Sequence, residues 1–172
     1  VELVDSYPLI WRCFQVPASL TLKQLHLVLQ AVMGWPGTAP HSFKVNGQQY
    51  GPAGNSESED ESAIALSDIF SSNPQPCFYT YNPQEGWLHR LELDEALVAQ
   101  PDQSYPHCLD GQRACPPEQS GGVWGYEDFL ERLNDPEEPD YAELWEQVGL
   151  DFDPERFDPQ AVNQHLQAIT LS

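Results

Sequence analysis

The sequence predicts an α+β fold over residues 1–172: a single domain with a roll-like antiparallel or mixed sheet packed against an N-terminal helix and C-terminal helices. Three observations lead to this prediction. Strand-like segments fill much of the first half of the chain, one strong helical pattern interrupts them, and further helical patterns fill the end. We find no linker long enough to divide the 172 residues into two domains, and this length is ordinary for one domain.

The first two predicted elements are a strand and a helix. Residues 7–17 are rich in apolar and aromatic residues and are bounded by prolines, which indicates a strand. Thr21 and Gln24 have the spacing of a capping box, and an apolar stripe follows them up to Met33. Gly34 fits the position just after a helix end, so we predict a helix over 22–33.

A hairpin, an acidic loop and two more strands come next. Residues 41–51 contain an Asn46-Gly47 pair, the preferred two-residue hairpin turn. Residues 52–62 are acidic and polar with no apolar anchor, so we expect a mobile acidic loop there. A single helical turn is expected near Ser67. Two aromatic or alternating segments then predict strands at 77–82 and 87–93.

The second half begins with an irregular stretch and ends in helices. Residues 100–123 are rich in proline and glycine, and a long irregular stretch in a compact domain is often functional. Helical spacing of apolar residues predicts helices at 126–133 and 141–148. Asp158 followed by Pro159 is a typical helix start, so we predict a final helix from that point.

The charge of the chain excludes several functions. There are 27 acidic residues against 7 Lys plus Arg, for a formal net charge of −20. This balance argues against direct nucleic-acid binding and against docking on anionic membranes, and a protein partner is expected to be basic. We find no apolar run long enough to span a membrane and no signal-peptide pattern. Four cysteines in a chain of this size favour a soluble, reduced, cytoplasmic protein.

Several motifs resemble one family over almost the whole chain. They are Pro8–Arg12, Val16–Ala18, Met33–Trp35, Tyr81–His89, Cys108–Glu118, Gly121–Gly122 and Phe152–Glu155. Together they resemble the plasmid pRiA4b ORF-3-like family, whose members also carry the transposon-passenger label TnpR. The resemblance implies an α+β roll-like domain and little about activity. A link to DNA recombination is disfavoured, because the five arginines are dispersed and no arginine cluster surrounds a nucleophilic serine.

The chain departs from the family pattern in two motifs, so it is a divergent member. Asn82 and Glu85 stand where the family has aspartates, and Gln119 and Ser120 stand where it has an aspartate and a cysteine. If the family uses those groups in a site, this chain has lost an acid and a thiol.

A zinc site is the first candidate for chemistry. Cys108 and Cys115 flank a glycine-containing turn, and His89 or His107 would join them as ligands. Their spacing is wider than the usual zinc knuckle. The structural alternative is a pair of ordinary thiols in a loop, or a disulfide between them that forms on oxidation.

A cleft built from two motifs is the second candidate. It would combine an acid, a base, a cation and aromatic walls, with His89, Glu85 and Glu118 as the candidate catalytic residues. The structural alternative, which we favour, is that the aromatic side chains fill the core. In that case His89 makes a buried hydrogen bond and Arg113 pairs with Glu118.

The leading interpretation is a protein-interaction module without catalysis. Its binding surface would consist of Tyr81, Trp87, Arg113, Trp124 and Tyr126. The rival is a zinc-binding or acid/base enzyme centred on His89, Cys108, Cys115 and Glu118. A third and weaker interpretation is an acidic mimic of DNA, which would need carboxylates at phosphate-like spacing.

Overall fold

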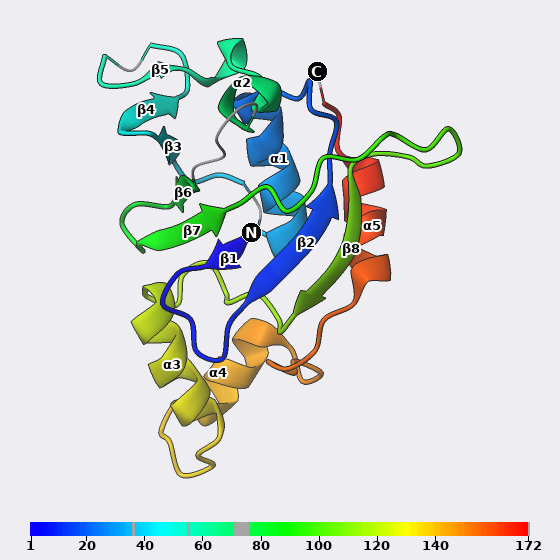
Figure 1. The fold of residues 1–172 in the computed structure, drawn as a ribbon. Helices are drawn as coiled ribbons and strands as arrows, with labels where there is room; N and C mark the ends of the chain where they lie inside the picture. The colour runs from blue at the N-terminus through cyan, green and yellow to red at the C-terminus, as the bar shows by residue number, and fades with distance from the viewer. Residues whose placement is uncertain (36, 55, 71–75, 172) are drawn as a thin grey trace.

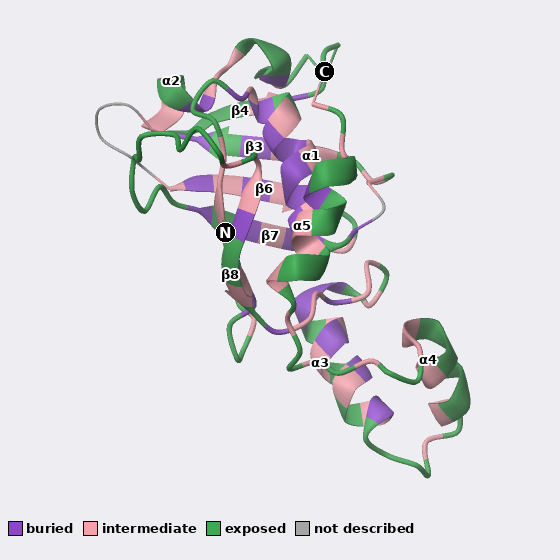
Figure 2. Ribbon diagram, turned by 90° about the vertical axis from the view of Figure 1, so that its right-hand side faces the viewer, coloured by how far each residue is buried: buried purple, intermediate pink, exposed green. Residues whose placement is uncertain are grey.

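The computed structural model describes residues 1–35, 37–54, 56–70 and 76–171, and it confirms the α+β prediction. Within these residues eight strands form one open sheet in the order β5-β4-β3-β6-β7-β1-β2-β8. Neighbouring strands are antiparallel except β4 and β5, which are parallel. Figure 2 shows helices α1 and α5 together over one side of the sheet, with α3 and α4 extending beyond it.

Helix α1 (Leu22–Met33) has the predicted bounds and supplies much of the core. The capping box is present: the Thr21 hydroxyl accepts from the Gln24 N–H at 3.3 Å, and the Gln24 Oε1 accepts from the Thr21 N–H at 3.0 Å. Gly34 ends the helix with a φ of +79°, a conformation that suits glycine. The apolar stripe of α1 is almost completely buried against the sheet.

Most strands lie where the sequence predicts them. Strand β2 (Trp11–Gln15) is shorter than the predicted 7–17, while β3 (His41–Val45) and β4 (Gln48–Gly51) form the hairpin. Asn46 and Gly47 both have positive φ, as the preferred hairpin turn requires. Strands β6 (Cys77–Tyr81) and β7 (Trp87–Leu91) match the two predicted strands and pair with each other.

Two strands were not predicted. Strand β1 (Glu2–Leu3) is very short, and β8 (His107–Gln112) lies inside the stretch 100–123 that was expected to be irregular. Strand β8 is at the sheet edge, pairs only with β2, and buries just Cys108, so its sequence lacks the usual alternation. On its outer side the Asn163 amide accepts from the Cys108 N–H at 2.7 Å and donates to the Cys108 carbonyl at 2.9 Å. The Asn163 side chain therefore takes the place of a next strand.

The acidic segment 52–62 contains an anchor that the sequence analysis missed. Its end forms the short strand β5 (Glu59–Asp60) and the 3₁₀ turn η1 (Glu61–Ala63), while residue 55 lies outside the described residues. Glu61 is only 3% exposed and its carboxylate lies 2.8 Å from Nε2 of His41. The anchor of this segment is therefore a polar side chain, which the apolar pattern of the sequence does not mark.

The remaining helices follow the predictions closely. Helix α2 (Leu66–Phe70) is the expected helical turn, and α4 (Tyr141–Val148) and α5 (Pro159–Ala168) have the predicted starts. Helix α3 (Gly122–Leu133) begins four residues earlier than the predicted 126. Its start has no side-chain cap of its own, and Glu85 from a distant turn accepts from the Gly121 N–H at 2.6 Å. In the described part of the chain, every helix is too short or too polar to cross a membrane.

Candidate functional site

The two motifs of the predicted cleft do come together, but their side chains hydrogen-bond to each other instead of lining a cleft. The Trp87 indole N–H donates to the Glu118 carbonyl at 2.8 Å, and the Tyr81 hydroxyl donates to the Glu118 carboxylate at 3.1 Å. The Trp35 indole donates to the Pro116 carbonyl at 2.9 Å. Together with the bond from Gly121 to Glu85, these contacts fix the connection between β8 and α3. Glu85 and Glu118 therefore have structural partners.

Four of the five residues of the predicted binding surface lie inside the protein, which corrects that prediction. Tyr81 and Trp87 are fully buried, and Tyr126 and Arg113 are almost so. The sequence pattern identified aromatic residues but did not tell which face of each element they occupy. Trp124 is the exception, with 74% of its surface exposed.

Arg113 makes a different ion pair from the one expected. Its guanidinium lies 2.9 Å from the Glu155 carboxylate and also donates to the Pro8 carbonyl at 3.1 Å. The predicted partner, Glu118, is occupied by Tyr81. Arg113 thus ties the segment before α5 to the loop between β1 and β2.

His89 lies in the core, where its imidazole packs against aromatic rings. It is completely buried, and its Nδ1 lies 3.4 Å from the Tyr79 carbonyl, while Nε2 has no hydrogen-bond partner. The edge-on Trp35 ring has its centroid 5.3 Å away. Burial lowers the pKa of His89 to about 4, so the imidazole is neutral near pH 7. A base without contact to solvent is poorly placed to exchange protons with a substrate.

The predicted zinc ligands do not come together. Within the described residues no three His, Cys, Asp or Glu side chains are placed to hold a metal ion, and all four cysteines are free thiols. The Cys108 thiol instead lies 3.6 Å from the Cys13 carbonyl. Burial raises the pKa of Cys108 to about 11 and also raises that of Cys115, which disfavours the thiolate form that binds zinc.

A buried cluster of polar rings was missed by the sequence analysis. The rings of His26 and His41 stack with centroids 3.4 Å apart, and Nδ1 of His26 lies 2.8 Å from the Tyr79 hydroxyl. Glu61 completes the cluster through His41. Four separate elements contribute these residues, so no local sequence signal marks them. Burial and the neighbouring His41 lower the pKa of His26 to about 3, which makes it a neutral partner of Tyr79.

Helix α3 carries the most distinctive exposed face. Trp124 and the acidic residues Glu127, Asp128 and Glu131 recur at helical spacing, opposite the buried Val123, Tyr126 and Phe129. Trp124, Asp128 and Glu131 are exposed and Glu127 is partly exposed. An exposed tryptophan beside several carboxylates is a surface that attracts cations.

The lobe formed by α3 and α4 concentrates negative charge. From 122 to 148 its acidic residues are Glu127, Asp128, Glu131, Asp135, Glu137, Glu138, Asp140, Glu143 and Glu146. Arg132 is the single base in that range, and it pairs with Asp128, Glu138 and Asp140. Figures 1 and 2 show this lobe projecting from the body of the molecule, so its surface is open to a partner.

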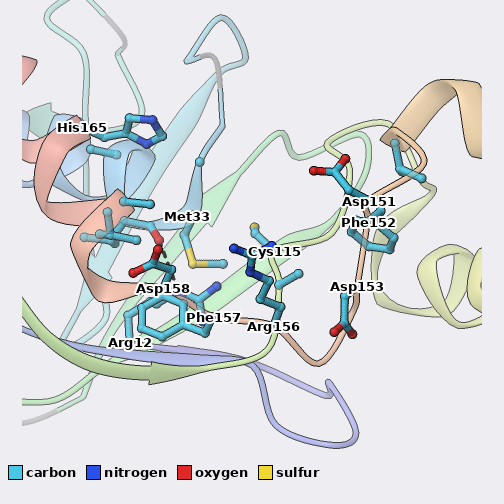
Figure 3. A pocket seen from close by; sticks show the side chains of 17 residues that line it. Arg12, Met33, Cys115, Asp151, Phe152, Asp153, Arg156, Phe157, Asp158 and His165 are labelled. Atoms are coloured by element: carbon cyan, nitrogen blue, oxygen red, sulfur yellow. Dashed lines mark hydrogen bonds between the residues drawn. The ribbon is translucent and has the colours of Figure 1, made fainter.

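A separate pocket of about 390 Å³ lies between α1, α5 and the chain on either side of Phe152 (Figure 3). Apolar side chains such as Met33, Phe152 and Val162 form much of its lining. Charged residues of both signs also line it, including Arg156 and Asp151. No local sequence pattern marks this pocket, because its lining comes from four distant segments.

The fold and these motifs define a class of protein. It has an open α+β sheet, and its motifs at 81–89 and 108–122 bond to each other and fix the connection between β8 and α3. The chain belongs to the plasmid pRiA4b ORF-3-like protein family, whose model matches residues 1–161. It is 31% identical over 158 residues to an uncharacterised protein, y4hQ, of Sinorhizobium fredii (strain NBRC 101917 / NGR234), a match that covers 89% of this chain and 81% of that protein.

A solved structure shares the fold. The crystal structure of a protein of unknown function, MM3350 from Methanosarcina mazei Go1, matches with a TM-score of 0.86 and 38% identity, covering 92% of each chain. The resemblance read from the motifs is therefore confirmed, and these relatives assign no activity to the fold.

Proposed function

We propose that this protein is a non-catalytic interaction module that binds a basic segment of a partner protein through the exposed face of α3. The observation that carries the proposal is Trp124, which is 74% exposed on a helix whose other face is buried. Tryptophan is enriched among the residues that dominate binding energy at protein interfaces. Such an exposed position has no packing role that would explain it.

The charge around Trp124 indicates the chemistry of the partner. Asp128 and Glu131 follow it on the same exposed face, within a lobe that holds one internally paired arginine. A net charge of −20 accelerates encounter with a basic partner and repels acidic ones. An arginine of the partner would stack on the Trp124 ring and reach the Asp128 carboxylate one turn along the helix, with Glu131 about one turn further.

The test is binding of a defined basic peptide. A fluorescein-labelled peptide of alternating Arg and Gly is titrated with the protein at low salt, and its anisotropy is followed. We expect Trp124→Ala to weaken binding about tenfold, as loss of an interface tryptophan commonly does. The double variant Asp128→Asn/Glu131→Gln is expected to weaken it by a similar factor.

A matched control separates a local site from general attraction. Asp94→Asn/Asp102→Asn removes the same charge from exposed positions outside the lobe and is expected to leave the affinity within about twofold of the wild type. Equal losses in both double variants, with no effect of Trp124→Ala, would show that only the overall charge attracts the peptide. The proposal would then be wrong.

A further inference from the structure

Arg12 places an unbalanced positive charge beside the pocket of Figure 3. Its guanidinium is 3% exposed and donates to the carbonyls of Trp11, Val32, Gln112 and Arg113 at 2.7–3.2 Å. The Phe157 ring covers it at 4.2 Å. Within the described residues no carboxylate pairs with it. The carbonyl dipoles hold the cation without neutralising it, so Arg12 contributes a positive charge to this part of the pocket wall.

Arg156 adds a second cation that faces the same pocket. It is exposed, and in the described chain it forms no ion pair, although the protein has a large excess of carboxylates. Figure 3 shows its side chain reaching toward Cys115. The guanidinium is therefore free to bind a carboxylate from outside, with the two-pronged geometry that this pair prefers.

Negative groups lie on other parts of the same lining. Asp158 caps α5 by accepting from the Gln160 N–H, and Asp153 accepts from the Glu155 N–H, so both have local partners. Asp151 is exposed and makes no hydrogen bond or ion pair to the described residues. The pocket thus presents one free cation and one free carboxylate, Arg156 and Asp151, around an apolar floor.

We infer that this pocket binds a free α-amino acid with an apolar side chain. The ligand's carboxylate would bind Arg156, with the Arg12 cation on the same lining, and its ammonium group would face Asp151. The apolar side chain would lie against Met33, Phe152 and Val162. The pocket volume of about 390 Å³ suits a small ligand. A zwitterion has no net charge, so it avoids the repulsion that a protein of net charge −20 exerts on an anion.

Calorimetric titration tests this with ligands that lose one charge at a time. L-leucine, L-methionine and L-phenylalanine are titrated first. The N-acetyl derivative then removes the ammonium group, and the carboxamide removes the carboxylate. We expect at least one of the three amino acids to bind with 1:1 stoichiometry, and both of its derivatives to bind at least tenfold more weakly.

Variants assign each charge to a residue. Arg156→Gln is expected to abolish the difference in affinity between the amino acid and its carboxamide. Asp151→Asn is expected to abolish the difference in affinity between the amino acid and its N-acetyl form. Both positions are exposed, so folding is expected to be intact, and Arg90→Gln serves as a distant control for the loss of a cation. Ala161→Trp fills the pocket and is expected to prevent binding, whereas Ala168→Trp on the same helix leaves it unchanged.

Three results would overturn the inference. One is the lack of any binding heat up to roughly 10 mM ligand, where a site with a Kd of about 1 mM would be mostly filled. The second is an affinity for the N-acetyl form equal to that for the free amino acid, which indicates a site for organic acids. The third is an affinity for the carboxamide equal to that for the free amino acid, which indicates a site for cations.

Discussion

At the scale of single residues, the buried Arg12 joins several parts of the molecule. Its four carbonyl partners belong to β2, to the end of α1, and to β8 with the residue that follows it. In the sequence it is one of five dispersed arginines, and nothing nearby distinguishes it. Its role depends on four main-chain carbonyls, and main-chain partners leave no signal in the side-chain sequence.

We predict that Arg12→Lys destabilises the protein by about 3 kcal/mol. A lysine ammonium has three donors on a flexible stem and cannot reach the same four carbonyls, and each buried carbonyl left unpaired costs about 1–3 kcal/mol. Urea denaturation measures the loss. Arg90→Lys at an exposed position is the control, with an expected change below about 0.5 kcal/mol. A similar small change at Arg12 would contradict its structural role.

The buried histidines predict a loss of stability in mild acid. The pKa values of His26 and His89 are lowered to about 3 and 4, whereas both groups titrate near 6.5 when unfolded. The unfolded chain therefore binds more protons than the folded chain in this range. The stability from these groups is complete above about pH 6.5 and is lost as the pH falls toward 4, with uptake of about two protons on unfolding.

Comparison with a variant isolates this effect from the many carboxylates. In His26→Gln, unfolding is expected to take up about one proton fewer than in the wild type between pH 6 and 4. The slope of the unfolding free energy against pH measures this uptake. Identical slopes in the two proteins would show that His26 is already charged in the folded state.

At the scale of elements, local signals explain what was predictable. The capping box of α1, the Asn46-Gly47 turn and the Asp158-Pro159 helix start each involve neighbouring residues, and each feature was predicted correctly. Strand β8 and the first turn of α3 depend on partners far along the chain. Asn163 is 55 residues from Cys108, and Glu85 is 36 residues from Gly121. Contacts of this kind are visible only after folding.

Asn163 gives a direct test of this edge contact. Asn163→Asp keeps an acceptor for the Cys108 N–H but places a carboxylate oxygen against the Cys108 carbonyl. We expect a loss of about 2 kcal/mol in unfolding free energy, together with faster hydrogen exchange along β8. Gln164→Asp, on an exposed position of the same helix, is the control for the added charge. Unchanged exchange in β8 would show that Asn163 does not secure the edge.

At the scale of the whole molecule, the predicted binding region does come together, but most of the side chains predicted to lie on its surface are buried. The motifs at 81–89 and 108–122 do come together, as expected, and they form interior contacts. Of the predicted surface, Trp124 alone is exposed. Composition and motif spacing locate a segment in the chain, whereas burial depends on how the complete sheet and helices pack around it.

The net charge acts on the whole molecule and makes the proposed interaction sensitive to salt. The Debye length falls from about 10 Å at 0.1 M to about 3 Å at 1 M salt. We expect the affinity for a basic peptide to fall steeply over this range, mainly through slower association. Binding that does not depend on salt would contradict an electrostatic origin.

Binding at the exposed face of α3 is best tested by a nitrogen–proton NMR spectrum recorded during titration with the basic peptide. We expect the Trp124 indole signal and the amides of the exposed α3 face to shift first and most. We expect the signals of the buried Trp87 and Trp35 to stay in place. Large shifts confined to other surfaces, or no shifts at a peptide concentration that saturates the anisotropy signal, would contradict the claim that α3 is the binding face.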